Sequence, residues 1–290
     1  MASANEQWDI VTGVGITALA VAAGRAMDTH RPDGLVRDPY AEAFVEAAKP
    51  PVAMPTRPSP GGEPLWEHLS DHMGVRSRYF DRFFEQAASA GIGQAVILAS
   101  GLDARAFRLE WPQDFRLFEV DQPKVLDFKD QVLGERSARP ACDRRGVRVD
   151  LRDDWAGALR DSGFDPRRPT AWLAEGLLPY LPPDAEQRLL EAVHELSAPG
   201  SRIALESPHR SLWQQDQEWF SEVSRRFGVD VGSLLHGDDR PTPDVPLTAL
   251  GWRTSLEAMP EIAERYGRSL APPAGDLAQR TRFVTARLPG

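Results

Sequence analysis

The sequence predicts an α/β protein built on a parallel, doubly wound sheet. From residue 94 onward, short runs of apolar and β-branched residues alternate with longer segments that have helical periodicity. The apolar residues in the short runs are consecutive instead of alternating with polar ones. That pattern is typical of strands covered by helices on both faces, as in α/β proteins with a parallel sheet.

Composition narrows the class of protein. The 290 residues allow one large α/β domain or two small ones, and contents of 41% hydrophobic and 27% charged residues are ordinary for a globular chain. The net charge of −9 argues against nucleic-acid binding, which needs a basic surface to meet phosphates. Cys142 is the only cysteine, which excludes disulfides within the chain and clusters of thiolate metal ligands.

The sequence indicates neither a signal peptide nor a membrane span. The first ten residues carry acids and lack a basic stretch. The apolar run at 13–27 is too short to cross a bilayer, and Arg25 interrupts it. We therefore expect a cytoplasmic protein that has neither nucleic-acid nor membrane partners.

The first 91 residues are predicted to be helical apart from one loop. Residues 12–48 read as two helices separated by 28–34, and the second begins after Asp38 and Pro39 as cap and first-turn residues. Six prolines in 50–64 exclude regular structure there, and a loop of this length is often a lid. An amphipathic helix, or two in series, follows over 65–91.

The remaining elements alternate between strand and helix. Helices are expected at 123–135 and 183–197, and the region 208–247 departs from the alternation. The expected strands are 94–99, 115–120, 146–149, 170–174, 201–206, 251–258 and 282–288.

Small residues and an acid follow the first two strands. Ala99, Ser100 and Gly101 come after the first strand and are small enough for a ligand to approach the backbone. A dinucleotide fingerprint would have three glycines here, and this turn has one. Asp121 ends the second run, 20 residues past Gly101, where a carboxylate can accept hydrogen bonds from both hydroxyls of a ribose. Asp121 could instead be a helix cap.

Acids also follow the next two strands. Asp150, followed by apolar Leu151, can accept a hydrogen bond from an adenine amino group, and Glu175 stands ahead of Gly176. An acid after a strand can simply cap the next helix, a role that Asp153 or Asp154 could also fill. Ligands of such sheets bind at the carboxyl ends of the strands, and this series fits an adenosine without phosphates. S-adenosylmethionine fits this pattern better than NAD does.

Asp103 is expected to have a structural role, unlike these strand-end acids. It lies in the turn after the first strand or at the start of the following helix, close in sequence to two arginines. We expect it to form an ion pair with Arg105 or Arg108 instead of binding a ligand.

Several motifs together resemble one family. "LASGLDARAFRL", "FEVDQPKVL", "VDLRDDW" and "AEGLLPYLP" resemble the leucine carboxyl methyltransferase-like branch of class I S-adenosylmethionine-dependent methyltransferases, a branch that includes many bacterial O-methyltransferases. "AAGRAMDTHRPDGLVRDPYAEAFV" and "GVRSRYFD" are similar to it too, so the resemblance runs from about residue 17 to 206. It implies a Rossmann-like sheet of seven strands with an antiparallel last strand, an N-terminal helical cap and an inserted cap.

The resemblance also suggests how the chain is divided. We expect a single methyltransferase domain over 1–290. Its expected parts are an N-terminal helical cap with the loop over 1–92, a cofactor-binding core over 93–207, an inserted substrate cap over 208–247 and C-terminal strands over 248–290.

The resemblance implies roles for particular residues. Arg76 would clamp the methionine carboxylate of the cofactor, with Arg25 assisting, because a guanidinium matches two carboxylate oxygens. Glu175 would lie near the cofactor's amino group. The remaining implied contacts are Gly101 and its neighbours Ala99 and Ser100 beside the methionine portion, Asp121 on the ribose, and Asp150 with Leu151 on the adenine.

The turn departs from the family at one position. The family usually has Gly-Ala-Gly where this chain has Ala99-Ser100-Gly101. A methyl group at Ala99 is tolerable if φ stays negative, but it could crowd the cofactor. The departure leaves open a non-catalytic binding relic as an alternative to an enzyme.

The expected reaction is O-methylation of a carboxylate on a small aromatic or polyketide-type metabolite in secondary metabolism. A carboxylate is already ionised at neutral pH and needs no base. A phenol or alcohol acceptor would need one. The candidates are His209, which could equally be an exposed loop residue, and Tyr180, which could equally serve packing.

Other readings remain. A protein C-terminal carboxyl group is a further acceptor, and a nicotinamide-dependent oxidoreductase is disfavoured by the missing glycines. His68 and His72 are four residues apart and could ligate a metal, but no third ligand is evident. We therefore expect no metal, and we expect both histidines to line the lid or face solvent. Trp66, Trp213 and Trp219 could line an acceptor pocket or join the caps to the core.

Overall fold

The computed structural model contains one sheet of seven strands in the order β3-β2-β1-β4-β5-β7-β6. It describes residues 10, 14–208, 224–230, 232–236, 240–270 and 281–290, to which all structural statements refer. The strands are β1 (Gln94–Leu98), β2 (Arg116–Asp121), β3 (Asp143–Arg148), β4 (Ala171–Ala174), β5 (Arg202–Pro208), β6 (Arg253–Ala258) and β7 (Thr281–Arg287).

The direction of the strands confirms the predicted fold class. β1 to β5 pair in parallel, whereas β7 pairs antiparallel with both β5 and β6. β7 alone therefore runs against the other strands of this sheet. The chain reverses its strand order between β1 and β4, which creates the switch point where ligands of open α/β sheets bind.

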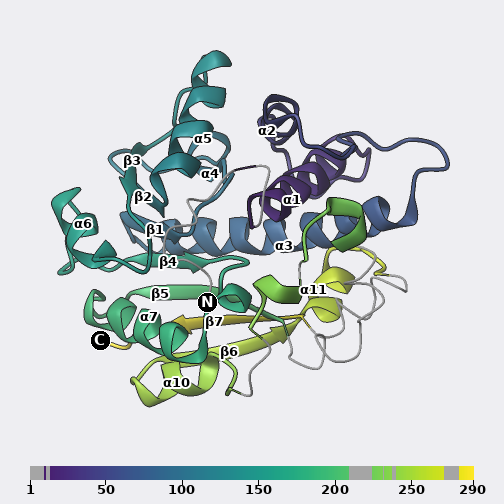
Figure 1. Ribbon diagram of the computed structural model, residues 1–290. Coiled ribbons are helices and arrows are strands. Elements are labelled where there is room, and N and C mark those ends of the chain that lie inside the picture. Colours follow the sequence, from purple (N-terminus) through teal and green to yellow (C-terminus); the bar gives the residue numbers. More distant parts are fainter. Residues whose placement is uncertain (1–9, 11–13, 209–223, 231, 237–239, 271–280) are drawn as a thin grey trace.

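Helices cover both faces of the sheet, as Figure 1 shows. Successive residues of β1 point to opposite faces, so that Ala95 and Ile97 join one apolar cluster and Val96 and Leu98 another. The first face is covered by α3 (Pro64–Ser89), α4 (Arg105–Arg108) and α11 (Met259–Arg265). The second is covered by α6 (Trp155–Asp161), α7 (Pro183–Glu195) and α10 (Asp244–Ala249).

A third apolar cluster joins the N-terminal helices to the rest. α1 (Val14–Thr29) and α2 (Ala41–Ala48) pack with α5 (Pro123–Glu135) and the first turns of α3. α1 and α3 approach closely at Gly24, because a Cβ atom there would lie 2.8 Å from Cγ of Met73. In Figure 1 both α1 and α2 lie on the side of α3 that faces away from the sheet.

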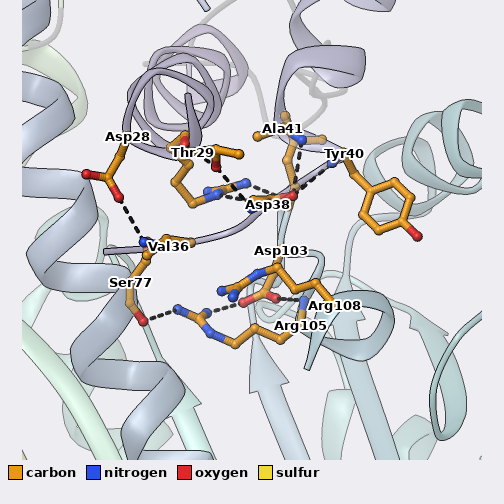
Figure 2. Close-up of polar contacts among 12 residues, drawn as sticks. Asp28, Thr29, Val36, Asp38, Tyr40, Ala41, Ser77, Asp103, Arg105 and Arg108 are labelled. Atoms are coloured by element: carbon orange, nitrogen blue, oxygen red, sulfur yellow. Dashed lines mark hydrogen bonds and ion pairs between the residues drawn. The ribbon is translucent and has the colours of Figure 1, made fainter. Parts of the chain in front are cut away.

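The second helix begins at Ala41 with Tyr40 as its N-cap residue, so Pro39 precedes the first turn instead of lying in it. Asp38 still binds the first amides of this segment. Its Oδ1 accepts hydrogen bonds from the amides of Tyr40 and Ala41 at 3.1 Å each (Figure 2). Residues 50–63 contain neither helix nor strand, in agreement with their prolines. Residues 64–89 form one helix, which settles the choice between one and two.

Among the predicted strands, the third departs most from the structure. The sequence predicts it at 146–149, whereas β3 begins at Asp143 and includes Arg144 and Arg145. β3 is an edge strand, so its polar residues stay in contact with water and give no apolar signal. Among the described residues, no helix combines the length and apolar character needed to cross a membrane.

Candidate functional site

The carboxyl ends of β1, β2, β4 and β5, with the loop after β3, carry the polar residues of the site. The turn after β1, Ala99 to Gly101, contributes backbone to the site. Ala99 has φ of 51° and Gly101 has φ of 47°, so both lie in the left-handed region. The condition of a negative φ, under which a methyl group at Ala99 would be tolerable, is therefore not met. An L-residue in this conformation costs about 1–2 kcal/mol. A Cβ atom on Gly101 would meet only the carbonyl oxygen of Ala99, at 4.0 Å, which leaves open space beside the turn.

Asp121 ties this turn to the end of β2. Its Oδ2 accepts the amide hydrogen of Gly101 at 2.6 Å, and its Oδ1 accepts that of Gln122 at 2.7 Å. Burial raises the pKa of Asp121 to about 6, against the lowering effect of these two amides. The carboxylate is thus held at the rim with both oxygens fixed and titrates close to neutral pH.

Gln122 connects Asp121 to Asp150: its backbone amide binds Asp121 and its side chain binds Asp150. Oδ2 of Asp150 accepts from Nε2 of Gln122 at 2.9 Å, and Arg152 donates to both carboxylate oxygens of Asp150 at 2.9 and 2.7 Å. The hydrogen bond from Arg152 lowers the pKa of Asp150 although burial opposes this. Asp154 caps α6 through the amide of Gly157 at 2.8 Å, so Asp150 is not needed for that task.

Leu151, the other residue expected at the adenine, is half-buried against the apolar cluster on the α6 face. Ser100 is buried in the turn after β1, and its amide donates to the carbonyl of Val120 at 3.2 Å. Its Oγ has no hydrogen-bond partner among the described residues. Together with Asp121 and Asp150 these residues form a rim over β1, β2 and β3.

Arg76 projects from α3 to the ends of β4 and β5. Its Nε lies 2.8 Å from Oε1 of Glu175 and 3.2 Å from Oε2 of Glu206. Gly176 has φ of 66°, and a Cβ atom there would lie 2.7 Å from Nη2 of Arg76. Burial disfavours the charge of Glu206, but Arg76, His72 and the amide of Gly176 together lower the pKa of Glu206.

A second arginine, Arg105, binds the other carboxylate oxygen of Glu175. Nη1 of Arg105 donates to Oε2 of Glu175 at 2.7 Å, and its Nε donates to Oδ1 of Asp81 at 2.7 Å. Figure 2 shows its guanidinium between the carbonyl of Ser77 and the carboxylate of Asp103, to both of which it donates.

The prediction that Asp103 pairs with Arg105 is confirmed. Burial opposes the charge of Asp103, yet Arg105 prevails and the pKa of Asp103 falls to about 2. Arg108 pairs instead with Asp81, through two hydrogen bonds of 2.7 Å.

Arg25 links the first helix to the turn after β1. Its Nε donates to Oδ2 of Asp38 at 3.0 Å, and its Nη2 donates to the carbonyl of Leu102 at 2.7 Å. These bonds link α1 to the turn after β1, so Arg25 supports the backbone of that turn. The structure gives it this structural role, and its expected help to Arg76 stays a prediction.

Tyr180 and His72 lie near Arg76 and Glu206. The Tyr180 hydroxyl lies 3.1 Å from Oγ1 of Thr17, and burial raises the pKa of Tyr180. His72 is buried, with Nε2 3.7 Å from Oε1 of Glu206 and with no hydrogen-bond partner for Nδ1 among the described residues. His209 lies outside the described residues, so its expected role stays a prediction.

Of the three tryptophans expected at the acceptor pocket or between the caps and the core, only Trp66 lies among the described residues. Trp66 is buried, and its ring packs edge to face on Phe227 at 5.9 Å, which favours the packing role. Trp213 and Trp219 lie outside the described residues. Among the residues that are described, no group of three or more histidine, cysteine or acidic side chains could hold a metal ion.

Sequence reasoning missed four residues of the site. Glu206 follows the same pattern as the other strand-end acids, but it was placed within the expected strand 201–206. Arg105 was read only as the partner of a turn residue. His72 was expected to line the lid or face solvent, or to bind a metal, and its burial shows that it does not face solvent. Gln122, which joins Asp121 to Asp150, carried no signal.

The chain is similar in sequence to known methyltransferases. The model of the leucine carboxyl methyltransferase family matches residues 18–194. A protein of Saccharopolyspora erythraea, named as a candidate S-adenosyl-L-methionine-dependent methyltransferase, is 53% identical over 98% of this chain and 99% of its own. One of Mycobacteroides abscessus with the same description is 47% identical over 99% and 96%.

Solved structures share the architecture. A DUF574 family protein from Streptomyces avermitilis superposes with a TM-score of 0.57 at 15% identity, covering 93% of this chain and 97% of its own. That likeness supports the Rossmann-like fold and nothing finer. The extent of the family match and the identity of the relatives show that the chain belongs to the leucine carboxyl methyltransferase family.

Proposed function

We propose that the protein transfers a methyl group from S-adenosyl-L-methionine to an oxygen atom of a small molecule, first of all a carboxylate of an aromatic or polyketide-type metabolite. The chain is an S-adenosyl-L-methionine-dependent methyltransferase by family. The observation that carries the assignment is the series of carboxylates Asp121, Asp150, Glu175 and Glu206 along the carboxyl edge of the sheet.

The donor set fits the cofactor. Asp121 would accept from the ribose hydroxyls, and Asp150 with Leu151 would hold the adenine. The open space beside Gly101 would admit the methionine portion. Arg76 would pair with the methionine carboxylate and Glu175 with the ammonium group, so each polar end of the ligand meets the opposite charge.

The net charge of the ion-pair cluster around Glu175 favours a cationic ligand. Three guanidinium groups, of Arg76, Arg105 and Arg108, face the four carboxylates of Asp81, Asp103, Glu175 and Glu206. One negative charge is left in excess. S-adenosylmethionine carries one net positive charge, whereas the diphosphate of a nicotinamide dinucleotide is anionic and would be repelled.

When bound, the cofactor supplies a methyl group on a positively charged sulfur. The protein holds the acceptor oxygen in line with that methyl group and excludes water, and positioning of this kind can lower a barrier by roughly 7–11 kcal/mol. A carboxylate acceptor is ionised at neutral pH, so these residues need not remove a proton from it.

A second acceptor class is favoured by one observation. His72 is buried with Nε2 directed at Glu206 and with Nδ1 unpartnered among the described residues. A base oriented by a carboxylate is the arrangement that a phenol or alcohol acceptor requires. His72 thus joins His209 as a candidate base, and the protein C-terminus remains the third acceptor class.

The chemical stability of the product separates the acceptor classes. The protein is incubated with tritiated S-adenosyl-L-methionine and a panel of aryl carboxylic acids and phenols, and products are treated with mild alkali. Methyl esters release labelled methanol, whereas aryl methyl ethers do not. Labelled ester supports the carboxylate proposal, labelled ether supports the hydroxyl acceptor, and no transfer to any compound despite cofactor binding contradicts both small-molecule proposals.

A further inference from the structure

We propose that Arg105 is a positioning residue for ligand binding: with Arg76 it fixes the carboxylate of Glu175 so that this group can bind the ligand's ammonium. The inference rests on the proposed function, because the ammonium group is that of the methionine portion of the cofactor.

The carboxylate of Glu175 is held from both sides. Its Oε1 accepts from Nε of Arg76 at 2.8 Å and its Oε2 accepts from Nη1 of Arg105 at 2.7 Å. The two arginines come from two different helices, α3 and α4. One bond alone would leave the carboxyl group free to rotate, whereas two bonds fix its plane.

Arg105 cannot itself contact a ligand. Its side chain is only 3% exposed, and its guanidinium also binds Asp81, Asp103 and the carbonyl of Ser77. These acceptors hold the arginine in place before any ligand arrives. Arg105 therefore acts through Glu175.

The charges around Glu175 make such support necessary. Glu175 lies in the turn after β4, directly before Gly176 with its φ of 66°. With Arg105 present, three guanidinium groups balance the three other carboxylates of the cluster. If Arg105 were absent, the neighbours of Glu175 would carry a net negative charge, and its carboxylate would turn away from Glu206 and Asp103. Fixing the group in advance removes this cost from the binding step.

Arg108 offers a matched control. Its side chain is 4% exposed, and it forms two hydrogen bonds with the same Asp81 that Arg105 binds. Its hydrogen bonds are with Asp81, not with Glu175. Arg108→Gln therefore removes a buried guanidinium from the same cluster and leaves the contact between Arg105 and Glu175 in place.

The experiment compares two ligands that differ in their amino-acid end. Calorimetry measures the dissociation constants of S-adenosylhomocysteine and of 5′-deoxy-5′-methylthioadenosine, which has the same base and ribose but no ammonium or carboxylate. Arg105→Gln should weaken binding of the first about tenfold and leave the second nearly unchanged. Arg108→Gln should leave the ratio of the two constants at its wild-type value, even where it lowers Tm.

A thermodynamic cycle excludes a purely structural role. If Arg105 acts through Glu175, Arg105→Gln should add little to the loss caused by Glu175→Gln, whereas independent effects would add. If Arg105→Gln does not fold, Arg105→Lys replaces it in the comparison. Lysine keeps the positive charge but lacks the planar guanidinium that binds several acceptors at once.

An unchanged ratio of the two constants, or additive losses, overturns the inference and leaves the proposed function intact. If the wild-type protein binds neither ligand, the proposed function fails and the inference fails with it.

Discussion

The carboxylate of Asp121 accepts the backbone amide of Gly101 at 2.6 Å, across the ends of two neighbouring strands. The acid at the end of β2 thereby sets the position of the turn after β1. The same carboxylate is the one proposed to hold the ribose. Ligand binding and the conformation of the turn are therefore coupled through this one side chain.

Cofactor affinity should depend on the ionisation of Asp121. Its pKa is about 6, and only the ionised form can accept from both ribose hydroxyls. Affinity for S-adenosylhomocysteine should therefore fall about tenfold from pH 7 to pH 5, as the carboxylate takes up its proton. Calorimetry at a series of pH values measures this fall.

Asp121→Asn is the control for this titration. The variant should bind more weakly at pH 7 and lose the dependence around pH 6, because position 121 no longer titrates. A wild-type affinity that stays constant between pH 7 and pH 5 would show that the ribose lies elsewhere.

Asp103 should stabilise the fold at neutral pH. Its pKa is lowered from an ordinary value near 3.8 to about 2, so the unfolded chain takes up the proton first as the pH falls. The contribution, about 2 kcal/mol, is present above pH 4 and is lost as the pH falls towards 2. Urea unfolding at pH 7 and at pH 3 measures it.

Asp103→Asn should lower the free energy of unfolding more at pH 7 than at pH 3. Equal losses at the two values would mean that the ion pair with Arg105 contributes nothing through its charge. Asp184→Asn provides a control, because that acid pairs with Arg188 at the surface, where both side chains are more than half exposed.

The fold could be predicted where burial leaves a trace in the sequence. The residues of β1 and β4 are all buried, so unbroken apolar runs marked both strands. The start of β3 was missed because Asp143 and its neighbours stay in contact with water at the sheet edge. Strand-end acids such as Asp121 were found by the same logic, since position after a strand is visible in the sequence.

The resemblance named Arg76 and Glu175, but the contacts of Glu175 with two arginines could not be predicted because they depend on tertiary packing. Arg105 and Arg76 are 29 positions apart, and both contact Glu175, which lies 70 positions beyond Arg105. No spacing rule predicts such a meeting. The conformation of Ala99 was likewise hidden, because an alanine in a turn gives no sign of a positive φ.

Ala99→Gly should stabilise the protein. Alanine at φ of 51° carries strain of about 1–2 kcal/mol, of which glycine relieves most while costing some entropy in the unfolded chain. A net gain of about 0.5 kcal/mol in unfolding free energy is expected. Urea unfolding measures it, and Ala95→Gly, within β1, should lose stability instead.

Gly176→Ala should separate binding of the amino-acid end from binding of the adenosine. The new methyl group would lie 2.7 Å from Nη2 of Arg76 and would push the guanidinium away from Glu175. Affinity for S-adenosylhomocysteine should fall about tenfold. Affinity for 5′-deoxy-5′-methylthioadenosine should change little, since that ligand makes no use of Arg76.

Gly267→Ala controls for backbone strain in this comparison. Gly267 has φ of 69°, close to the 66° of Gly176, but a Cβ atom there meets nothing within 4 Å. Gly267→Ala should lose only the stability that strained alanine costs. Gly176→Ala should lose more, because it also displaces the guanidinium of Arg76 from its buried ion pair with Glu175. Only Gly176→Ala should change the ratio of the two dissociation constants. If both variants leave the ratio at its wild-type value, Arg76 does not hold the amino-acid end of the ligand.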